Sequence, residues 1–172
     1  MNSEKSTRIR KRHLTELNMG SIGRETVAGL ELDLTTGTTV YYSSEDQAHP
    51  IEHMFDGCSG RGGTRWVAAQ RDTTEQLVLE FNEPLDISRI EFEVEELQFE
   101  RTQQVSAEYS VDGGATFHRS FVQEYTFSPD GATYQLESLA VKLRGVMQLR
   151  LTVVPNKGGS GAASVTSLRL YS

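Results

Sequence analysis

Side chains that could do chemistry gather in a long, glycine-rich loop between residues 43 and 69. The loop carries His49, His53 and the only cysteine, Cys58, and it leads to the only tryptophan. His49 and His53 have the i, i+4 spacing that places two zinc ligands on one face of a helix. Two ligands are too few for zinc, and Pro50 follows His49 directly, so the pattern does not predict a zinc site.

The same loop holds the best candidate for a metal site. A hard cation such as Ca²⁺ takes six to eight oxygen ligands, many of them backbone carbonyls. Asp56, a run of small residues and Thr64 can curl to supply such oxygens. Asp56-Gly57 is also a common turn, so an ordinary turn is the alternative interpretation.

The sequence offers little support for catalysis, and we expect the chain not to be an enzyme. It has no G-x-S-x-G elbow, and Cys58 has no recognisable catalytic context. Carboxylates cluster in residues 91–100, but alternation along a strand would put Glu91, Glu93 and Glu95 on one solvated face. An acid–base pair needs carboxylates in two different environments. The cluster is therefore interpreted as a charged edge that resists aggregation.

Aromatic, arginine and amide side chains near loops are the usual tools for binding a sugar. Rings stack on the apolar face of a pyranose, while arginine, glutamate or glutamine binds its hydroxyls. Residues 100–103 lie between two expected strands and residues 123–125 fall in a later connection, so both could line one rim. The candidate ligand-binding residues are Arg101, Gln103, Glu124 and Tyr125. A polar loop without a ligand is the alternative.

The composition is that of a single ordinary domain: 172 residues, 37% hydrophobic and 24% charged. No apolar run approaches the roughly 20 residues needed to span a bilayer, so no membrane partner is expected. Residues 1–20 lack the apolar segment of a secretory signal, and a single cysteine excludes an internal disulfide. These features lead us to expect a cytoplasmic protein.

The charge is unevenly distributed along the chain. Residues 1–13 hold five basic side chains and one acidic side chain, whereas the other 159 residues hold 12 basic and 23 acidic ones. An acidic body argues against a groove that follows phosphates, so no nucleic-acid partner is expected. Residues 1–28 are interpreted as a partly flexible, solvated N-terminal arm, with one helical turn over 14–19. Contact of its basic residues with nucleic acid or an anionic surface is the alternative.

Alternating apolar and polar residues predict an all-β sandwich over residues 29–172. About eight short strands are expected, separated by turns. The alternating stretches are 30–34, 39–42, 77–81, 90–94, 105–111, 116–121, 134–139, 149–153 and 165–170. Pro84 and Pro155 are expected to end strands, Asp112-Gly113-Gly114 to form a hairpin turn, and residues 157–161 to be flexible.

A set of short motifs occurs in a fixed order along the chain. The first are Tyr42-Ser43-Ser44, His49-Pro50-Ile51-Glu52, Asp56-Gly57 and Thr64-Arg65-Trp66. The later ones are Tyr109–Gly114, Gln123–Pro129, Leu149–Leu151 and Val165–Tyr171. Together they resemble the discoidin-type, or galactose-binding-like, domains of the coagulation-factor C-type family over residues 38–172. Gln123–Pro129 resembles a bacterial branch usually described as carbohydrate-binding.

The resemblance implies an eight-stranded antiparallel jelly-roll β-sandwich whose loops at one end bind a ligand without transforming it. The bacterial branch implies a lectin-like module for a sugar or glycan. Many family members hold a structural Ca²⁺ with this loop and a glutamate just before the last strand. Asp56 and Thr64 match the loop, and Ser167, or else Thr166, stands where the glutamate would be. A hydroxyl at that position weakens a calcium site.

Intracellular relatives leave a second function open. A similar opening occurs in the amino-terminal domain of a DNA single-strand-break repair scaffold, and a small intraflagellar transport subunit shares H-P-x-E-x-x-x-D-G. Those domains bind proteins rather than sugars, and a shared fold does not decide between the two. The alternative is therefore an intracellular protein–protein interaction domain.

Overall fold

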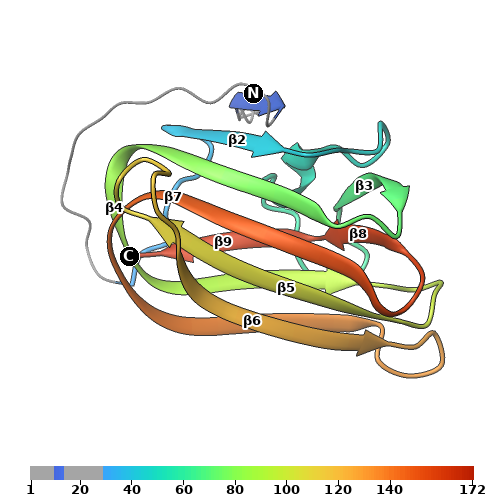
Figure 1. Cartoon of the computed structure of the whole chain (residues 1–172). Helices are drawn as coiled ribbons and strands as arrows, with labels where there is room; N and C mark the ends of the chain where they lie inside the picture. The colour runs from blue at the N-terminus through green and yellow to red at the C-terminus, as the bar shows by residue number, and fades with distance from the viewer. Residues whose placement is uncertain (1–9, 14–28) are drawn as a thin grey trace, which may run out of the picture.

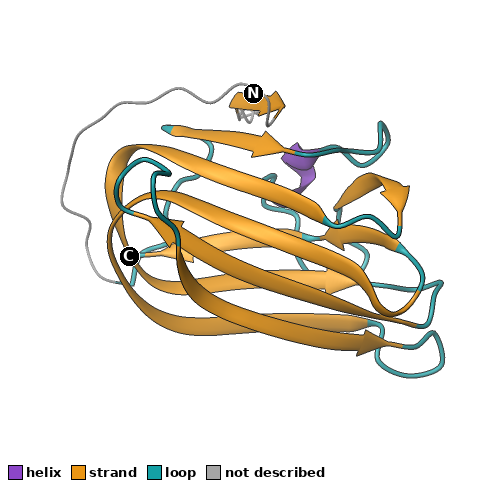
Figure 2. Ribbon diagram, viewed as in Figure 1, coloured by secondary structure: helices purple, strands orange, loops and turns teal. Residues whose placement is uncertain are grey.

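The computed structural model describes residues 10–13 and 29–172, and these residues are almost entirely β-structure (Figures 1 and 2). The strands are β1 (Arg10–His13), β2 (Thr38–Tyr42), β3 (Trp66–Arg71), β4 (Glu75–Glu95), β5 (Arg101–Ser110), β6 (His118–Phe127), β7 (Tyr134–Gly159), β8 (Ala162–Val165) and β9 (Ser167–Tyr171). One 3-10 helix, η1 (Ile51–Met54), lies between β2 and β3. No helix in these ranges is long and apolar enough to cross a bilayer. The predicted all-β sandwich is confirmed.

Two long strands organise the sandwich. β4 and β7 are antiparallel neighbours from Glu75, opposite Val153, to Glu95, opposite Tyr134. Register shifts between residues 80 and 89 mark where both strands curve back, and each then continues in the opposite layer (Figure 1). The first half of β4 pairs with β2 and its second half with β9, while the second half of β7 pairs with β5. β4 and β7 thus belong to both layers, and the apolar core lies between the two layers.

The prediction that Pro84 and Pro155 end strands is wrong. Pro84 lies inside β4, at a register shift between residues 80 and 85, and Pro155 lies inside β7, at a second shift. Proline cannot donate a ladder hydrogen bond, but at a bulge no such bond is required. The stretches on either side of each proline therefore form one strand rather than two. Gly158 and Gly159, expected to be flexible, pair with β5.

The alternating stretch 30–34 does not form the predicted strand. It makes a single β-bridge, Glu31 with Tyr171, and Leu30 is 58% exposed. The carboxylate of Asp33 accepts hydrogen bonds from the backbone N–H of Thr35 at 2.9 Å and from nearby hydroxyls. This turn chemistry ends the extended run before a ladder can form.

Part of the basic arm is a strand. Arg10–His13 pairs in parallel with β2, which the sequence did not predict. Residues 1–9 and 14–28, including the predicted helical turn over 14–19, lie outside the described residues. The division of the chain at residue 28 stays a prediction.

The acidic face predicted over residues 91–95 is not solvated. Glu93 is 2% exposed and Glu95 is 4% exposed, and the side chain of Glu91 is 14% exposed. The alternating apolar residues of this strand are also buried, so both faces of β4 are covered here. Alternation alone cannot distinguish a solvated polar face from one that another segment covers.

We expect Gly159→Ala to destabilise the fold much more than Gly145→Ala. Both glycines have a positive φ, which costs alanine about 1–2 kcal/mol. A Cβ at Gly145 has no neighbour within 4 Å, whereas one at Gly159 would collide with the carbonyl oxygen of Glu100 and lie 3.0 Å from the Cα of Arg101. The collision should cost about 1–3 kcal/mol more. Urea denaturation of both variants measures the difference, and equal losses would contradict the close packing of β7 on β5.

Candidate functional site

Arg101 and Gln103 lie together on β5, inside the sandwich. Arg101 is 1% exposed, and Gln103 is completely buried. The guanidinium donates to Gln103 Oε1 at 2.7 Å, to Ser164 Oγ at 3.1 Å and to the carbonyl of Pro155 at 3.2 Å. Its Nε donates to Glu96 at 2.8 Å. Gln103 in turn donates to the carbonyl of Ser164 at 2.8 Å, so the network ties β5 to β8.

This geometry does not support the predicted ligand-binding rim. The donors of Arg101 are directed at the protein itself, and the predicted residues are not brought together on one surface. Tyr125 packs against Phe92 with ring centroids 6.0 Å apart, and burial, together with the negative charge of Glu137, raises the pKa of its hydroxyl. Glu124 is exposed and lies 3.5 Å from Lys157. Arg101, Gln103 and Tyr125 are therefore placed to stabilise the interior rather than to contact a sugar.

The buried carboxylates of β4 hold the glycine-rich loop in place. The backbone N–H of Gly60 donates to Glu93 at 2.6 Å, and that of Gly62 donates to Glu95 at 2.9 Å. Arg169 adds a hydrogen bond to Glu93 at 2.7 Å. A buried carboxylate is costly unless it is paired, and hydrogen bonds to a charged acceptor are among the strong ones. The loop supplies the missing donors, which explains why these acids are inside.

The predicted calcium ligands are only partly assembled. Thr64 Oγ1 donates to Asp56 Oδ2 at 2.5 Å, and the N–H of Cys58 donates to Asp56 Oδ1 at 2.8 Å. Both carboxylate oxygens thus already accept hydrogen bonds. Ser167 is buried at the start of β9, and the neighbouring Thr166 hydroxyl is buried with no hydrogen-bond partner among the described residues.

These donors do not fit a calcium ion. Six to eight oxygens are needed, and a tight site uses several carboxylates. Asp56 supplies one carboxylate, while the position expected for a glutamate carries a hydroxyl. Residues 10–13 and 29–172 contain no group of three or more His, Cys, Asp or Glu side chains that could hold a metal ion. The loop is fixed instead by hydrogen bonds from the backbone N–H groups of Gly60 and Gly62 to Glu93 and Glu95.

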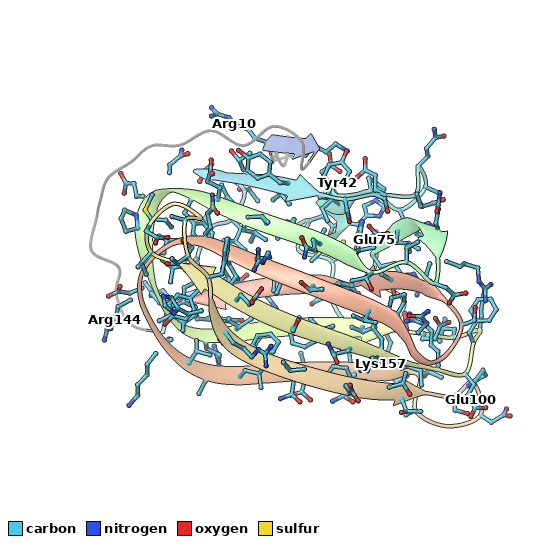
Figure 3. All side chains as sticks on the ribbon, viewed as in Figure 1. Arg10, Tyr42, Glu75, Glu100, Arg144 and Lys157 are labelled. Carbon is cyan, nitrogen blue, oxygen red and sulfur yellow. The ribbon has the colours of Figure 1, made fainter. Side chains whose placement is uncertain are left out.

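A hollow of about 260 Å³ opens at the end of the sandwich that carries β3 and β8. Residues 96–99 of the connection from β4 to β5 form one wall, and Ala162 and Ser164 of β8 form part of another. Arg65, Val67 and His49 complete the lining. Figure 3 shows Glu100, the last residue of that connection, at this end of the molecule.

The hollow combines an exposed ring with polar groups. Phe99 is 38% exposed, and the guanidinium of Arg71 lies 4.3 Å from its ring centroid, which fixes the ring. His49 Nδ1 lies 2.9 Å from Asp46, and Arg65 donates to the carbonyl of Glu95 at 3.3 Å. An aromatic surface beside a few oriented polar groups is the usual arrangement of a small-molecule site.

The sequence prediction missed most of this hollow. In the sequence, His49 stands out for its spacing from His53 and, like Arg65, as part of a motif, and neither pattern indicates a hollow. Leu97 and Phe99 are isolated apolar residues in a short acidic connection, and that was the available signal. Such residues are often buried, so their exposure could not be known before the structure.

Comparisons with known proteins bear on the fold. The sequence matches no protein-family model and no curated protein. The structure is similar to the family 32 carbohydrate-binding module of Clostridium perfringens NanJ in complex with galactose, with a TM-score of 0.58, 14% identity, and coverage of 85% of this chain and 100% of that one. It is similar to a CBM32 module of Clostridium perfringens in complex with GalNAc-β-1,3-galactose, with a TM-score of 0.57, 16% identity, and coverage of 83% and 100%.

A third similarity is to part of a larger chain. A fucosidase of Ruminococcus gnavus in complex with fucose matches with a TM-score of 0.58 and 14% identity, over 81% of this chain and 26% of that one. At these identities the likeness shows the fold. The chain has the galactose-binding-like β-sandwich fold of the family 32 carbohydrate-binding modules, and the resemblance to discoidin-type domains is confirmed at that level.

We expect Arg101→Met to destabilise the protein by about 3–5 kcal/mol, because it removes the guanidinium from the partly buried Glu96 and from the fully buried Gln103. Arg144→Met is the control, since the side chain of Arg144 is 82% exposed and its surface ion pair with Asp86 should contribute little to stability. Urea denaturation measures both. Similar losses for the two variants would contradict a structural role for the buried network.

The Arg101 effect should also depend on pH. Burial raises the pKa of Glu96, but the hydrogen bonds from Arg101 and the backbone outweigh it and hold the pKa below its ordinary value of 4.5. The stabilisation is therefore complete above pH 4.5 and is lost as the pH falls through the lowered pKa. The difference in the free energy of unfolding between wild type and Arg101→Met should therefore become smaller in that pH range.

Calcium should leave the stability of the chain almost unchanged. A site with a dissociation constant of about 10 μM would stabilise the fold by about 2.7 kcal/mol at ~1 mM Ca²⁺, which is a rise of roughly 5–10 °C in Tm. We expect a shift below about 1 °C when Ca²⁺ is added to chelated protein, with Mg²⁺ as the control. A large rise with Ca²⁺ alone would contradict this expectation and show that the chain binds the ion.

Proposed function

We propose that this chain is a non-catalytic carbohydrate-binding module that holds one sugar residue, free or at the end of a glycan, in the hollow beside Phe99. The observation that carries the proposal is the exposed Phe99 ring in a hollow of about 260 Å³ with polar groups around it. The shared fold with modules in complex with galactose and GalNAc-β-1,3-galactose supports it.

The hollow has the two kinds of surface that a pyranose requires. The ring of Phe99 stacks on the apolar C–H face of the sugar, and Leu97, 50% exposed, extends that apolar surface. His49, Arg65 and Gln98, which line the same hollow, hydrogen-bond the hydroxyls. Because Arg71 already holds the ring, little side-chain entropy is lost on binding.

The affinity for a single sugar should be modest. A monosaccharide has about a dozen non-hydrogen atoms, and about 0.3 kcal/mol per atom gives roughly −4 kcal/mol, which corresponds to a Kd of about 1 mM. A module of this kind therefore relies on a longer glycan, or on several attached copies, for tight binding.

The acidic groups at the hollow suit binding better than hydrolysis. Glycoside hydrolysis needs one carboxylic acid with a raised pKa beside a second carboxylate. The pKa of Glu96 is lowered, because the hydrogen bonds from Arg101 and the backbone outweigh the effect of burial. Glu95 accepts the N–H of Gly62 and is 4% exposed. Neither carboxylate is placed to donate a proton to a glycosidic oxygen.

We expect Phe99→Ala to weaken sugar binding at least tenfold, because the stacking surface is removed. Leu136→Ala is the matched control: Leu136 is 47% exposed on β7 and does not line the hollow. Glycan-array screening identifies the ligand, and NMR titration of both variants measures its Kd. Failure to bind any glycan at about 10 mM, or full affinity in a folded Phe99→Ala variant, would contradict the proposal.

A further inference from the structure

The edge of the sandwich at β2 is covered by a segment of the basic arm. Arg10 lies opposite Thr39, Lys11 opposite Val40, and His13 opposite Tyr42. The pairing is parallel, and every other strand pair among the described residues is antiparallel. Figure 1 shows this short strand lying alone along β2, at the outside of the sheet.

Lys11 is held by three groups from three different segments. Its Nζ lies 2.9 Å from Glu45, 3.0 Å from Glu52 and 5.9 Å from the centroid of the Tyr42 ring. Tyr42 ends β2, Glu45 lies in the following connection, and Glu52 lies on η1. Burial lowers the pKa of Lys11, but the two carboxylates outweigh it and raise the pKa above its ordinary value. The ammonium group is therefore held in its charged form.

The site for the ammonium group does not depend on Lys11 for its shape. Glu45 accepts the backbone N–H of Ile51 at 2.9 Å and the hydroxyl of Tyr42 at 3.3 Å. Its carboxylate would keep its position if the lysine left. The outer strand of a sheet, next to a fixed pocket for one side chain, is the arrangement by which proteins bind an extended peptide through strand addition.

The segment that occupies this edge is weakly held. β1 has four residues, and a short edge strand with exposed ion pairs contributes little stability. A second segment of the same chemistry can therefore compete with it. The acidic body attracts such a segment, because residues 14–172 hold 23 acidic side chains and 12 basic ones.

We propose that the β2 edge, with Glu45 and Glu52, is a receptor for an extended basic segment of another protein. The segment binds as a parallel strand and places a lysine between the two carboxylates. Arg10–His13 occupies the receptor in cis until a partner displaces it. This inference does not rest on the proposed sugar site, because none of these residues lines the hollow beside Phe99.

The test is a titration of the full-length protein with a fluorescent peptide that has the sequence of residues 7–14, TRIRKRHL, followed by anisotropy. If the arm occupies the edge nine-tenths of the time, the apparent affinity for a competing peptide is reduced about tenfold. Lys11→Ala in the protein should therefore make the peptide bind about tenfold tighter than it binds to the wild type. Lys157→Ala, which removes a lysine paired with Glu124, is the matched control and should change nothing.

The carboxylates are tested in the Lys11→Ala protein. Adding Glu45→Gln and Glu52→Gln should weaken the peptide about three- to tenfold, while Glu124→Gln, the matched surface carboxylate, should not. A glutamine at residue 45 can still accept the N–H of Ile51, so the fold is kept, and circular dichroism checks it. A peptide with glutamate in place of its lysine should not bind.

Three results would overturn the proposal. The first is unchanged peptide affinity in Lys11→Ala. The second is equal binding of the peptide with glutamate in place of lysine. The third is a wild-type dimer in sedimentation that Lys11→Ala converts to a monomer, because the occupant would then be the arm of a second copy.

Discussion

The structure depends on one constraint: a charged group taken out of water must have all its hydrogen bonds made within the protein. The Arg101 guanidinium lies between β5 and β8 and donates hydrogen bonds to Glu96, Gln103, Ser164 and the Pro155 carbonyl. Glu96 opens the connection that forms a wall of the hollow. The surface proposed to bind a sugar is therefore held in place by an interaction in the interior, through the planar, rigid fork of donors that arginine provides.

The same constraint explains the glycine-rich loop. Buried carboxylates on β4 need donors, and backbone amides at Gly60 and Gly62 provide them at short range. Glycine is also needed where the guanidinium approaches the chain, since a Cβ at Gly161 would lie 2.8 Å from Arg101 Nε. The glycines thus meet two requirements: their backbone amides pair with buried carboxylates, and their lack of a Cβ lets the Arg101 side chain approach the backbone.

Alternation was enough to predict the fold class, because a period of two is a strong signal over many short stretches. It failed for Glu93 and Glu95, which it predicts to be solvated, because the glycine-rich loop covers them. It also failed at Leu30, because hydrogen bonds to Asp33 end the extended run that alternation predicts to be a strand. For the site, the chemistry of Arg101 was recognised but its direction was not, because a loop position does not tell whether a side chain turns inward. Phe99 could not be singled out, since its exposure depends on contacts between β3, β8 and the β4–β5 connection.

The curvature of β4 and β7 has a consequence for how the molecule comes apart. Each layer contains one half of β4 and one half of β7. If one layer unfolded, the other would lose the packing on its apolar face, and that face would be exposed to water. Neither layer has a separable set of strands that could persist alone. We therefore expect the sandwich to unfold as one cooperative unit, without an intermediate in which a single sheet survives.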